Sequence, residues 1–189
     1  MANLYIISGC NGAGKTTASY TVLPEILNCR EFVNADEIAK GLSPFQPETV
    51  ALQAGRIMLE RIDDLLKSKK DFAFETTLAS RSYVNTVKVA KKLGYSVTLL
   101  YFWLASPEMA KERVKQRVER GGHNIPEETI ISRYYSGIKN LFELYMPVVD
   151  GWIIVDNSET PFELIAKCEN PNLEIFNILT FNLIKNTNP

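Results

Sequence analysis

The chain has 189 residues, of which 46% are hydrophobic, and 21 basic against 22 acidic side chains give a formal net charge of -1. This length suits one globular domain with a sizeable core and is short for two. The balanced charge provides no field of one sign, which argues against nonspecific binding to nucleic acid or to an acidic membrane surface.

The cysteine content and the N-terminus indicate a cytoplasmic protein. The chain has three cysteines, Cys10, Cys29 and Cys168, and their spacing fits no metal-ligand pattern. We expect them to be reduced thiols. The N-terminus lacks the basic flank and the long apolar run of a signal peptide. The longest apolar stretch, 97–105, is too short to span a membrane. We therefore expect no membrane partner.

Strand-like and helix-like segments alternate along the chain, which is the pattern of a parallel sheet covered by helices. The predicted strands are 4–7, 32–33, 72–74, 97–104 and 152–155. The predicted helices are about 15–24, 48–67, 80–93, 107–120 and 126–145, with another starting at Thr160-Pro161-Phe162-Glu163. This order predicts a three-layer α/β fold with a mostly parallel, five-stranded sheet and helices on both faces. We expect one domain over 1–169 and an extension over 170–189 packed on it, with a short strand at 173–176 and a short helix.

Residues 9–16, Gly-Cys-Asn-Gly-Ala-Gly-Lys-Thr, match the phosphate-loop pattern G-x-x-x-x-G-K-[ST]. Glycines let backbone N–H groups turn inward into an anion nest, and the following helix points its positive end at the phosphates. In such a loop Lys15 reaches the β- and γ-phosphates and the Thr16 hydroxyl ligates Mg²⁺. Because the motif follows a buried strand and opens a helix, the sequence predicts a site for ATP and Mg²⁺. The expected ATP-binding residues are Gly9, Asn11, Gly12, Ala13, Gly14, Lys15, Thr16, Thr17 and Asn157.

Ligands of open parallel sheets bind beyond the carboxyl ends of the strands, so the residues that follow each strand matter most. Asp36 follows the second strand and could accept the proton of an attacking substrate hydroxyl, although it could instead cap a helix. Glu37 competes for the same role. Glu75 follows the third strand, where it could hold Mg²⁺ through water, bind a substrate hydroxyl, or be a solvated turn carboxylate.

Three further positions near strand ends carry weaker signals. Thr77 could touch substrate or cap the next helix, and Arg81, four residues on, is included with Asp36, Glu75 and Thr77 in the predicted substrate site. Asn157 lies where it could contact the edge of an adenine base, and turn formation is an equal or better explanation.

Arg113, Arg117 and Arg120 share one face of the predicted helix 107–120, and Arg133 lies on the next helix. Gly121 and Gly122 break the chain between the two helices, which predicts a hinged lid over about 107–145. Arginines on such a lid can neutralise charge on a moving phosphoryl group. The alternative is a solvated basic face. Catalysis is favoured for Arg120 and Arg133, and His123 is expected to be structural.

Together these segments resemble the zeta-toxin family of small P-loop kinases, and more closely its zeta-like predicted kinase branch. The matching segments are 9–16, Asn34-Ala35-Asp36, Glu75-Thr76-Thr77-Leu78, 117–133 with Gly-Gly-His-Asn-Ile-Pro at 121–126, and Asp156-Asn157-Ser158. The resemblance implies that Asp36 is the base, that Lys15 and Thr16 serve phosphates and Mg²⁺, that Glu75 and Thr77 hold substrate, and that Arg120 and Arg133 stabilise the transferred group. It also implies a nucleotide sugar, UDP-N-acetylglucosamine, as acceptor.

Three hypotheses for function follow. The first is an ATP-dependent kinase, with 1–169 as the kinase domain, that phosphorylates a hydroxyl of a small molecule. The second is a nucleotide-dependent switch that binds a protein partner without a small-molecule acceptor. The third, a kinase of nucleic-acid ends, is disfavoured by the balanced charge. An antitoxin partner would accompany a toxin, although one sequence cannot identify it.

Overall fold

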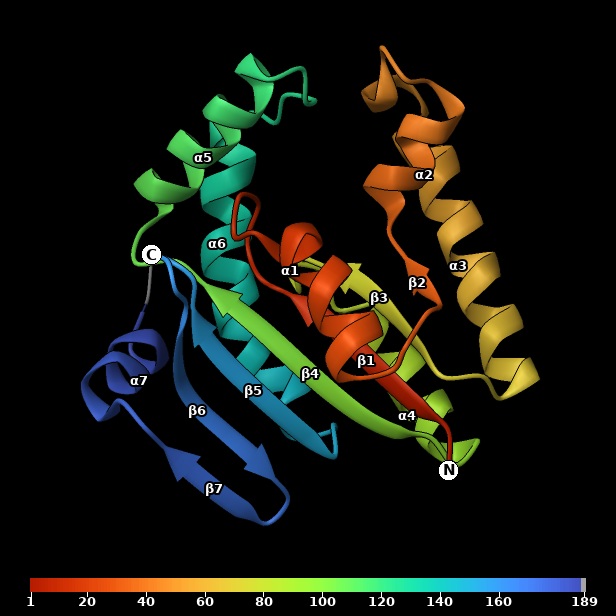
Figure 1. Cartoon of the computed structure of the whole chain (residues 1–189), viewed down its shortest axis with the longest axis vertical. Helices are drawn as coiled ribbons and strands as arrows, with labels where there is room; N and C mark the ends of the chain where they lie inside the picture. The colour runs from red at the N-terminus through yellow and green to blue at the C-terminus, as the bar shows by residue number, and fades with distance from the viewer. Residues whose placement is uncertain (188–189) are drawn as a thin grey trace.

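The computed structural model describes residues 1–187, in which seven strands form one sheet in the order β2-β3-β1-β4-β5-β6-β7 (Figure 1). The strands are β1 (Asn3–Ser8), β2 (Phe32–Val33), β3 (Phe72–Thr76), β4 (Ser96–Trp103), β5 (Gly151–Asp156), β6 (Glu163–Glu169) and β7 (Asn172–Ile175). The first five are parallel, whereas β6 and β7 are antiparallel to their neighbours. The carboxyl ends of β1 to β5 therefore meet at one edge of the sheet.

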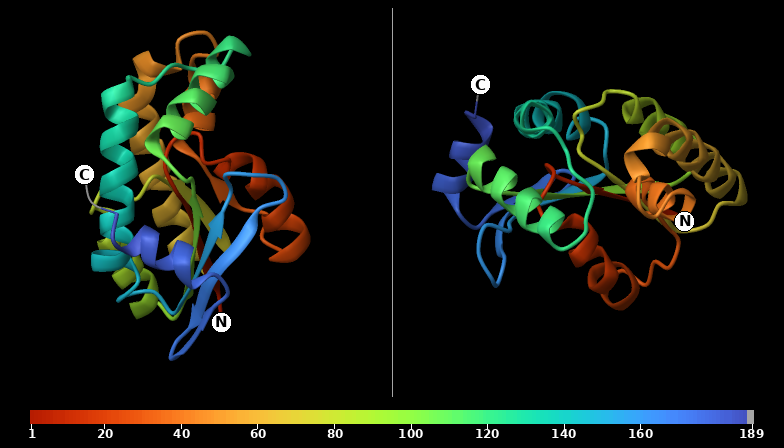
Figure 2. Two further views of the ribbon diagram at one scale, coloured as in Figure 1. Left: turned by 90° about the vertical axis from the view of Figure 1, so that its left-hand side faces the viewer. Right: turned by 90° about the horizontal axis from the view of Figure 1, so that it is seen from above.

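Helices cover both faces of this sheet, as the alternating pattern predicts (Figure 2). They are α1 (Lys15–Thr21), α2 (Ala35–Leu42), α3 (Ala51–Ser68), α4 (Tyr83–Lys92), α5 (Pro107–Glu119), α6 (Glu127–Asn140) and α7 (Ile178–Lys185). Short π-helical turns at Val22–Ile26 and Leu141–Tyr145 follow α1 and α6, and a 3₁₀ turn at Pro47–Val50 precedes α3. Helix α1 lies on one face, and α4, α6 and α7 lie on the other.

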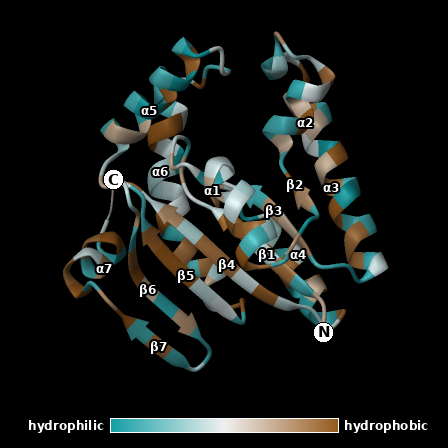
Figure 3. Ribbon diagram, in the orientation of Figure 1, coloured by the Kyte–Doolittle hydropathy of each residue, from teal (hydrophilic) through white to brown (hydrophobic). Residues whose placement is uncertain are grey.

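The core lies where the sequence is apolar on both faces of the central strands. Leu4, Ile6 and Ile7 of β1 are at most 1% exposed, and β4 is buried along most of its length. Figure 3 shows the hydrophobic colour running along these strands while α5 presents hydrophilic residues. Burial on both faces is expected of interior parallel strands. The phosphate loop follows β1, so it lies at the carboxyl edge of this buried central part of the sheet.

The sheet has seven strands where the sequence predicts five, and the predicted helix start at 160–163 is wrong. Residues 163–169 form β6, which pairs with β5 from Asp156↔Glu163 to Gly151↔Glu169. The cap-like residues precede a strand because β5 would otherwise leave its edge unpaired, and tertiary pairing overrides local propensity. The predicted strand near 173–176 is β7 and the predicted helix is α7, where Phe181 stacks on Trp152 at 6.3 Å between ring centroids.

The second difference concerns the segment after β2. Helix α2 is not among the predicted helix ranges, and only the alternative that Asp36 caps a helix pointed to it; its N-cap is Asn34, which has the expected residue type. The fold brings α2 and α3 together as an arm beyond the β2 edge, facing α5 across the carboxyl edge of the sheet (Figure 1). Among the described residues, no helix combines the length and apolar character needed to cross a bilayer.

Candidate active site

The phosphate loop joins β1 to α1 and depends on three glycines with positive φ. These angles are 139° at Gly9, 79° at Gly12 and 80° at Gly14. A Cβ atom at Gly9 would lie 2.2 Å from the Phe102 carbonyl oxygen, and one at Gly14 would lie 2.5 Å from Asn157 Nδ2. At Gly9 the close approach is to backbone and leaves no room for a Cβ atom, whereas at Gly14 a Cβ atom would displace the Asn157 side chain and the positive φ favours glycine.

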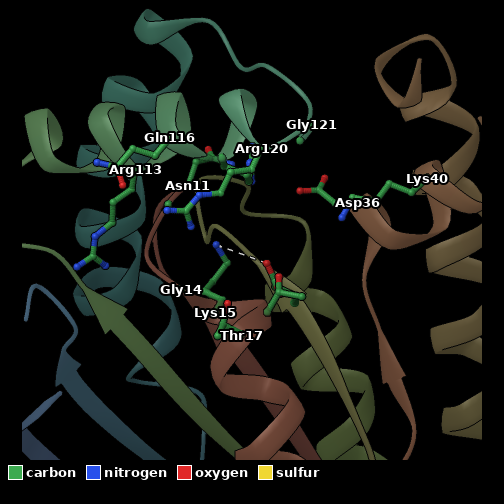
Figure 4. Close-up of a pocket in the computed structure, with 15 residues that line it drawn as sticks. Asn11, Gly14, Lys15, Thr17, Asp36, Lys40, Arg113, Gln116, Arg120 and Gly121 are labelled. Carbon is green, nitrogen blue, oxygen red and sulfur yellow. Dashed lines mark hydrogen bonds and ion pairs between the residues drawn. The ribbon is translucent and has the colours of Figure 1, made fainter. Parts of the chain in front are cut away.

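Lys15 is the first residue of α1 and its side chain is only 6% exposed. Its Nζ donates a hydrogen bond to the Cys10 carbonyl at 2.9 Å and lies 3.5 Å from Glu75 Oε1 (Figure 4). The ammonium group is therefore held inside the curve of its own loop, beside a carboxylate that offsets the cost of burial.

Glu75 lies near the end of β3 and joins three residues of the site. Its Oε2 accepts hydrogen bonds from the Thr16 hydroxyl at 2.7 Å and from Asn34 Nδ2 at 2.9 Å. Its Oε1 faces Lys15. A hydroxyl and a carboxylate oxygen are hard ligands of the kind that Mg²⁺ prefers, so the Thr16–Glu75 pair fits the predicted metal position.

Asp36 lies in the first turn of α2, and its carboxylate makes no hydrogen bond with another side chain of residues 1–187. The alternative prediction, that Asp36 caps the helix, is wrong. The cap is Asn34, whose Oδ1 accepts from the backbone N–H of Asp36 at 2.8 Å and of Glu37 at 3.4 Å. Glu37 instead pairs with Lys40 at 2.6 Å. The Asp36 carboxylate is thus free to face the space between α2 and the phosphate loop (Figure 4).

A cavity of about 710 Å³ brings most of these groups together. Two neighbouring cavities of about 600 and 310 Å³ share Asp36 and His123. The lining residues of the largest cavity are Asn11, Gly12, Gly14, Lys15, Thr16, Thr17, Asp36, Lys40, Glu75, Arg113, Gln116, Arg117, Arg120, Gly121 and Gly122. Phosphate-loop, base and arginine candidates from four separate segments therefore meet around one volume.

The arginines of the predicted lid divide into two pairs. Arg113 donates to the Ser158 carbonyl at 2.7 Å and Arg117 to the His123 carbonyl at 3.2 Å, so both fasten loops while lining the cavity. Arg120 follows α5 and also lines the cavity. Arg133 reaches back from α6 and donates to Asn11 Oδ1 in the phosphate loop at 3.2 Å.

These features agree with the comparison with known proteins, in which residues 2–162 match the family model described as Zeta toxin. The chain belongs to the zeta toxin family. An uncharacterized protein of Haemophilus influenzae is 31% identical over 126 residues, which cover 67% of this chain and 88% of that protein. The resemblance inferred from the motifs is thereby confirmed.

Solved structures share the fold of this family member at low sequence identity. A chain of the AvrRxo1-ORF1:AvrRxo1-ORF2 complex, solved with sulphate ions, is 16% identical with a TM-score of 0.79, over 98% of this chain and 64% of that one. A chain from the PezAT chromosomal toxin-antitoxin system of Streptococcus pneumoniae is 15% identical with a TM-score of 0.66, over 91% and 74%. This zeta toxin family member thus spans less than two thirds of the AvrRxo1 chain, and it has the three-layer, kinase-like α/β fold that the sequence predicts.

Several predicted residues do not line the main cavity of this zeta-family chain: Gly9 and Ala13 of the loop, Arg133, which lines the neighbouring cavity of about 310 Å³, and Asn157, Thr77 and Arg81. Asn157 donates to the Ala13 carbonyl at 2.8 Å, and this contact braces the phosphate loop. The Thr77 hydroxyl accepts from the Ala79 N–H at 3.4 Å, as a turn residue would, and Arg81 is exposed. Conversely, Gln116 and Lys40 line the cavity without having been predicted. Helical spacing was the available signal, since Gln116 follows Arg113 by three residues and Lys40 follows Asp36 by four.

Burial sets the protonation of two further groups near the site. It raises the pKa of the Cys10 thiol from 9.0 to about 11, and neighbouring Lys15 only partly opposes this. A neutral, buried thiol is unreactive, so Cys10 acts as a small filler of the loop. Burial also lowers the pKa of His123, against the opposing effect of Asp36.

Proposed function

We propose that this chain is an ATP-dependent kinase that transfers the γ-phosphoryl group to a hydroxyl group of a small molecule. The observation that carries the proposal is the convergence of Lys15, Thr16 and Glu75 with Asp36 and Arg120 around one cavity. A structure of the AvrRxo1-ORF1:-ORF2 complex was solved with ATP, and family membership supports the same nucleotide here.

In this mechanism Asp36 accepts the proton of the acceptor hydroxyl, whose oxygen then bonds to the γ-phosphorus. The bond between the γ-phosphorus and the β–γ bridging oxygen breaks, and ADP leaves. Lys15 and the loop N–H groups bind the phosphates, while Arg120 and Arg133 stabilise charge on the transferred group. Residues 107–145, which carry these arginines, are the proposed lid of the kinase domain 1–169, and the described part of the extension, 170–187, packs beside that domain.

Mg²⁺ would be held by Thr16 and Glu75, where it would neutralise charge that develops on the phosphate oxygens. Among residues 1–187 there is no cluster of three or more His, Cys, Asp or Glu that could hold a metal alone. This agrees with a cation that shares its coordination with nucleotide phosphates and water.

The acceptor that the family resemblance favours is a nucleotide sugar such as UDP-N-acetylglucosamine. The cavities of about 600 and 310 Å³ beside Asp36 give room for such a molecule next to the base. Asp36, Glu75, Thr77 and Arg81 are the proposed acceptor-binding residues, and Asn157 is proposed to contribute to ATP binding. We expect the enzyme to work in the cytoplasm. Since PezAT is a toxin-antitoxin system, an antitoxin protein is the proposed partner.

Purified protein with Mg·ATP and a panel of hydroxyl acceptors, including sugar nucleotides, tests the proposal by mass spectrometry of the products. We expect one acceptor to gain a phosphoryl group and Asp36→Ala to abolish the transfer. Turnover that is indifferent to every acceptor and to Asp36→Ala, together with nucleotide-dependent capture of a protein, would instead support the switch hypothesis.

A further inference from the structure

Asn34 joins β2 to α2 and is 6% exposed. Its Oδ1 accepts from the N–H groups of Asp36 and Glu37, at 2.8 and 3.4 Å. Its Nδ2 donates to Glu75 Oε2 at 2.9 Å and to the Thr16 hydroxyl at 3.4 Å. A carboxamide has two N–H donors and an oxygen with two acceptor positions, so every hydrogen-bonding position of this side chain is used.

These partners also fix which way the carboxamide points. A flipped side chain would put its oxygen against the Glu75 carboxylate and its NH₂ group against two backbone donors. Capping alone requires only an oxygen, which Ser or Asp would supply as well. The contact with Glu75 requires an N–H donor at the same position, so both ends of Asn34 have a specific partner.

The sheet gives little other support at this point. Strand β2 has two residues and pairs with β3 only through Phe32↔Ala73 and Val33↔Phe74. Asn34 follows Val33 and Glu75 follows Phe74, so these two residues stand where the next pair of the β2–β3 ladder would be. The hydrogen bond from Asn34 Nδ2 to Glu75 Oε2 links the two strands at this position. The start of α2, which carries Asp36, is hydrogen-bonded to the end of β3 through this side chain, in addition to the packing of Ala35 and Ile38 on the core.

We infer that Asn34 is a positioning residue for the proposed phosphoryl transfer, which holds Asp36 at a fixed distance from the Thr16–Glu75 pair. The inference rests on the proposed function, because that distance separates the base from the phosphate and metal position. Asn34 does not touch the reacting atoms. It acts through the first turn of α2 on one side and through Glu75 on the other.

Two variants separate capping from this connection. Asn34→Ser and Asn34→Asp both keep a capping oxygen for α2, but neither keeps the N–H donor that reaches Glu75. The serine hydroxyl ends one bond short of the Nδ2 position, and the ionised aspartate has no donor and places a second negative charge beside Glu75. Asn177 provides a matched control, because it caps α7 through Thr180 N and donates to Glu163 Oε1 at 2.9 Å, and neither residue lines the cavities of the site. Asn177→Ser therefore removes an equivalent bond without altering the site.

We expect Asn34→Ser to lower kcat by about 10- to 100-fold, as loss of a hydrogen bond to a charged group predicts, while KM for ATP changes less than about threefold. Asn34→Asp should lose more, and both variants should stay folded at the assay temperature, with melting temperatures no more than about 10 °C below the wild type. Asn177→Ser should keep the wild-type kcat. A wild-type kcat in both Asn34 variants would overturn the inference, as would a loss that merely tracks unfolding.

A second measurement does not depend on turnover. Hydrogen exchange at the Asp36 and Glu37 amides should slow when Mg²⁺ and a non-hydrolysable ATP analogue bind the wild type. In Asn34→Ser the analogue should still protect α1 but no longer slow these two amides. If the wild type binds the analogue yet phosphorylates no acceptor, the proposed function fails while this test still decides the role of Asn34. Equal slowing in wild type and variant would refute that role.

Discussion

Thr16 and Glu75 are 59 positions apart in the sequence, yet the threonine hydroxyl donates to the Glu75 carboxylate across 2.7 Å. The parallel register of β1 and β3 brings them together. Ile7 lies opposite Glu75, and the phosphate loop begins two residues later, at Gly9. Glu75 thus contacts both phosphate-loop side chains, Thr16 and Lys15, that the mechanism assigns to nucleotide binding.

Removing the negative charge of Glu75 tests its assignment to the metal. Glu75→Gln keeps an oxygen for the Thr16 hydroxyl but removes the charge that faces Lys15 and would attract Mg²⁺. We expect kcat to fall about 100-fold or more and the Mg²⁺ concentration for half-maximal activity to rise. Glu31→Gln, which affects an exposed pair with Arg61, is the control. An unchanged Mg²⁺ dependence would remove Glu75 from the metal site.

Asp36 and Glu37 are adjacent carboxylates with different expected effects. Asp36→Asn keeps the shape of the side chain but cannot accept a proton, so we expect kcat to fall about 100- to 10,000-fold with little change in ATP affinity. Glu37→Gln breaks only the exposed pair with Lys40 and should leave kcat near the wild-type value. Steady-state kinetics with parallel ATP titrations distinguish the two. The reverse order of effects would transfer the role of base to Glu37.

Arg133 lies on α6, the second helix of the proposed lid, and contacts Asn11 of the phosphate loop. Arg133→Lys keeps the charge but loses the planar group that donates to Asn11 and could contact two phosphate oxygens together. We expect kcat to fall about 100-fold with a small change in KM for ATP, because the contact strengthens as charge develops. Arg61→Lys, on the exposed face of α3, is the control. A change in KM alone would indicate that Arg133 binds nucleotide without stabilising transfer.

The phosphate loop, the parallel strands and the convergence of Asp36 with Glu75 could all be predicted from the sequence. Each of these depends on local pattern and on the rule that parallel strands present their ends at one edge. The strand at Glu163–Glu169 could not be predicted, because the free edge of β5 rather than local propensity selects it. The bracing contact of Asn157 with Ala13 was also missed, since it depends on a loop approach that only the folded chain shows.

Two glycines should respond to substitution in opposite ways. Gly55 lies inside α3 with no atom within 4 Å of a Cβ position, so Gly55→Ala should stabilise the fold by about 0.5–1 kcal/mol. Gly9→Ala would place a Cβ against the Phe102 carbonyl oxygen at positive φ, and it should destabilise by at least about 2 kcal/mol. Denaturant unfolding measures both. A stable Gly9→Ala protein that binds ATP normally would contradict the loop geometry.

Alkaline pH should weaken the fold through Cys10. Burial raises the pKa of this thiol to about 11 from 9.0, so the unfolded chain ionises first as pH rises. The stabilising contribution is therefore complete below about pH 9, is lost progressively between about pH 9 and 11, and is on the order of 2 kcal/mol. We expect the free energy of unfolding to fall less steeply over this window in Cys10→Ala than in the wild type. Denaturant titrations at several pH values give the two slopes, and equal slopes would mean that Cys10 ionises as readily in the folded protein as in the unfolded chain.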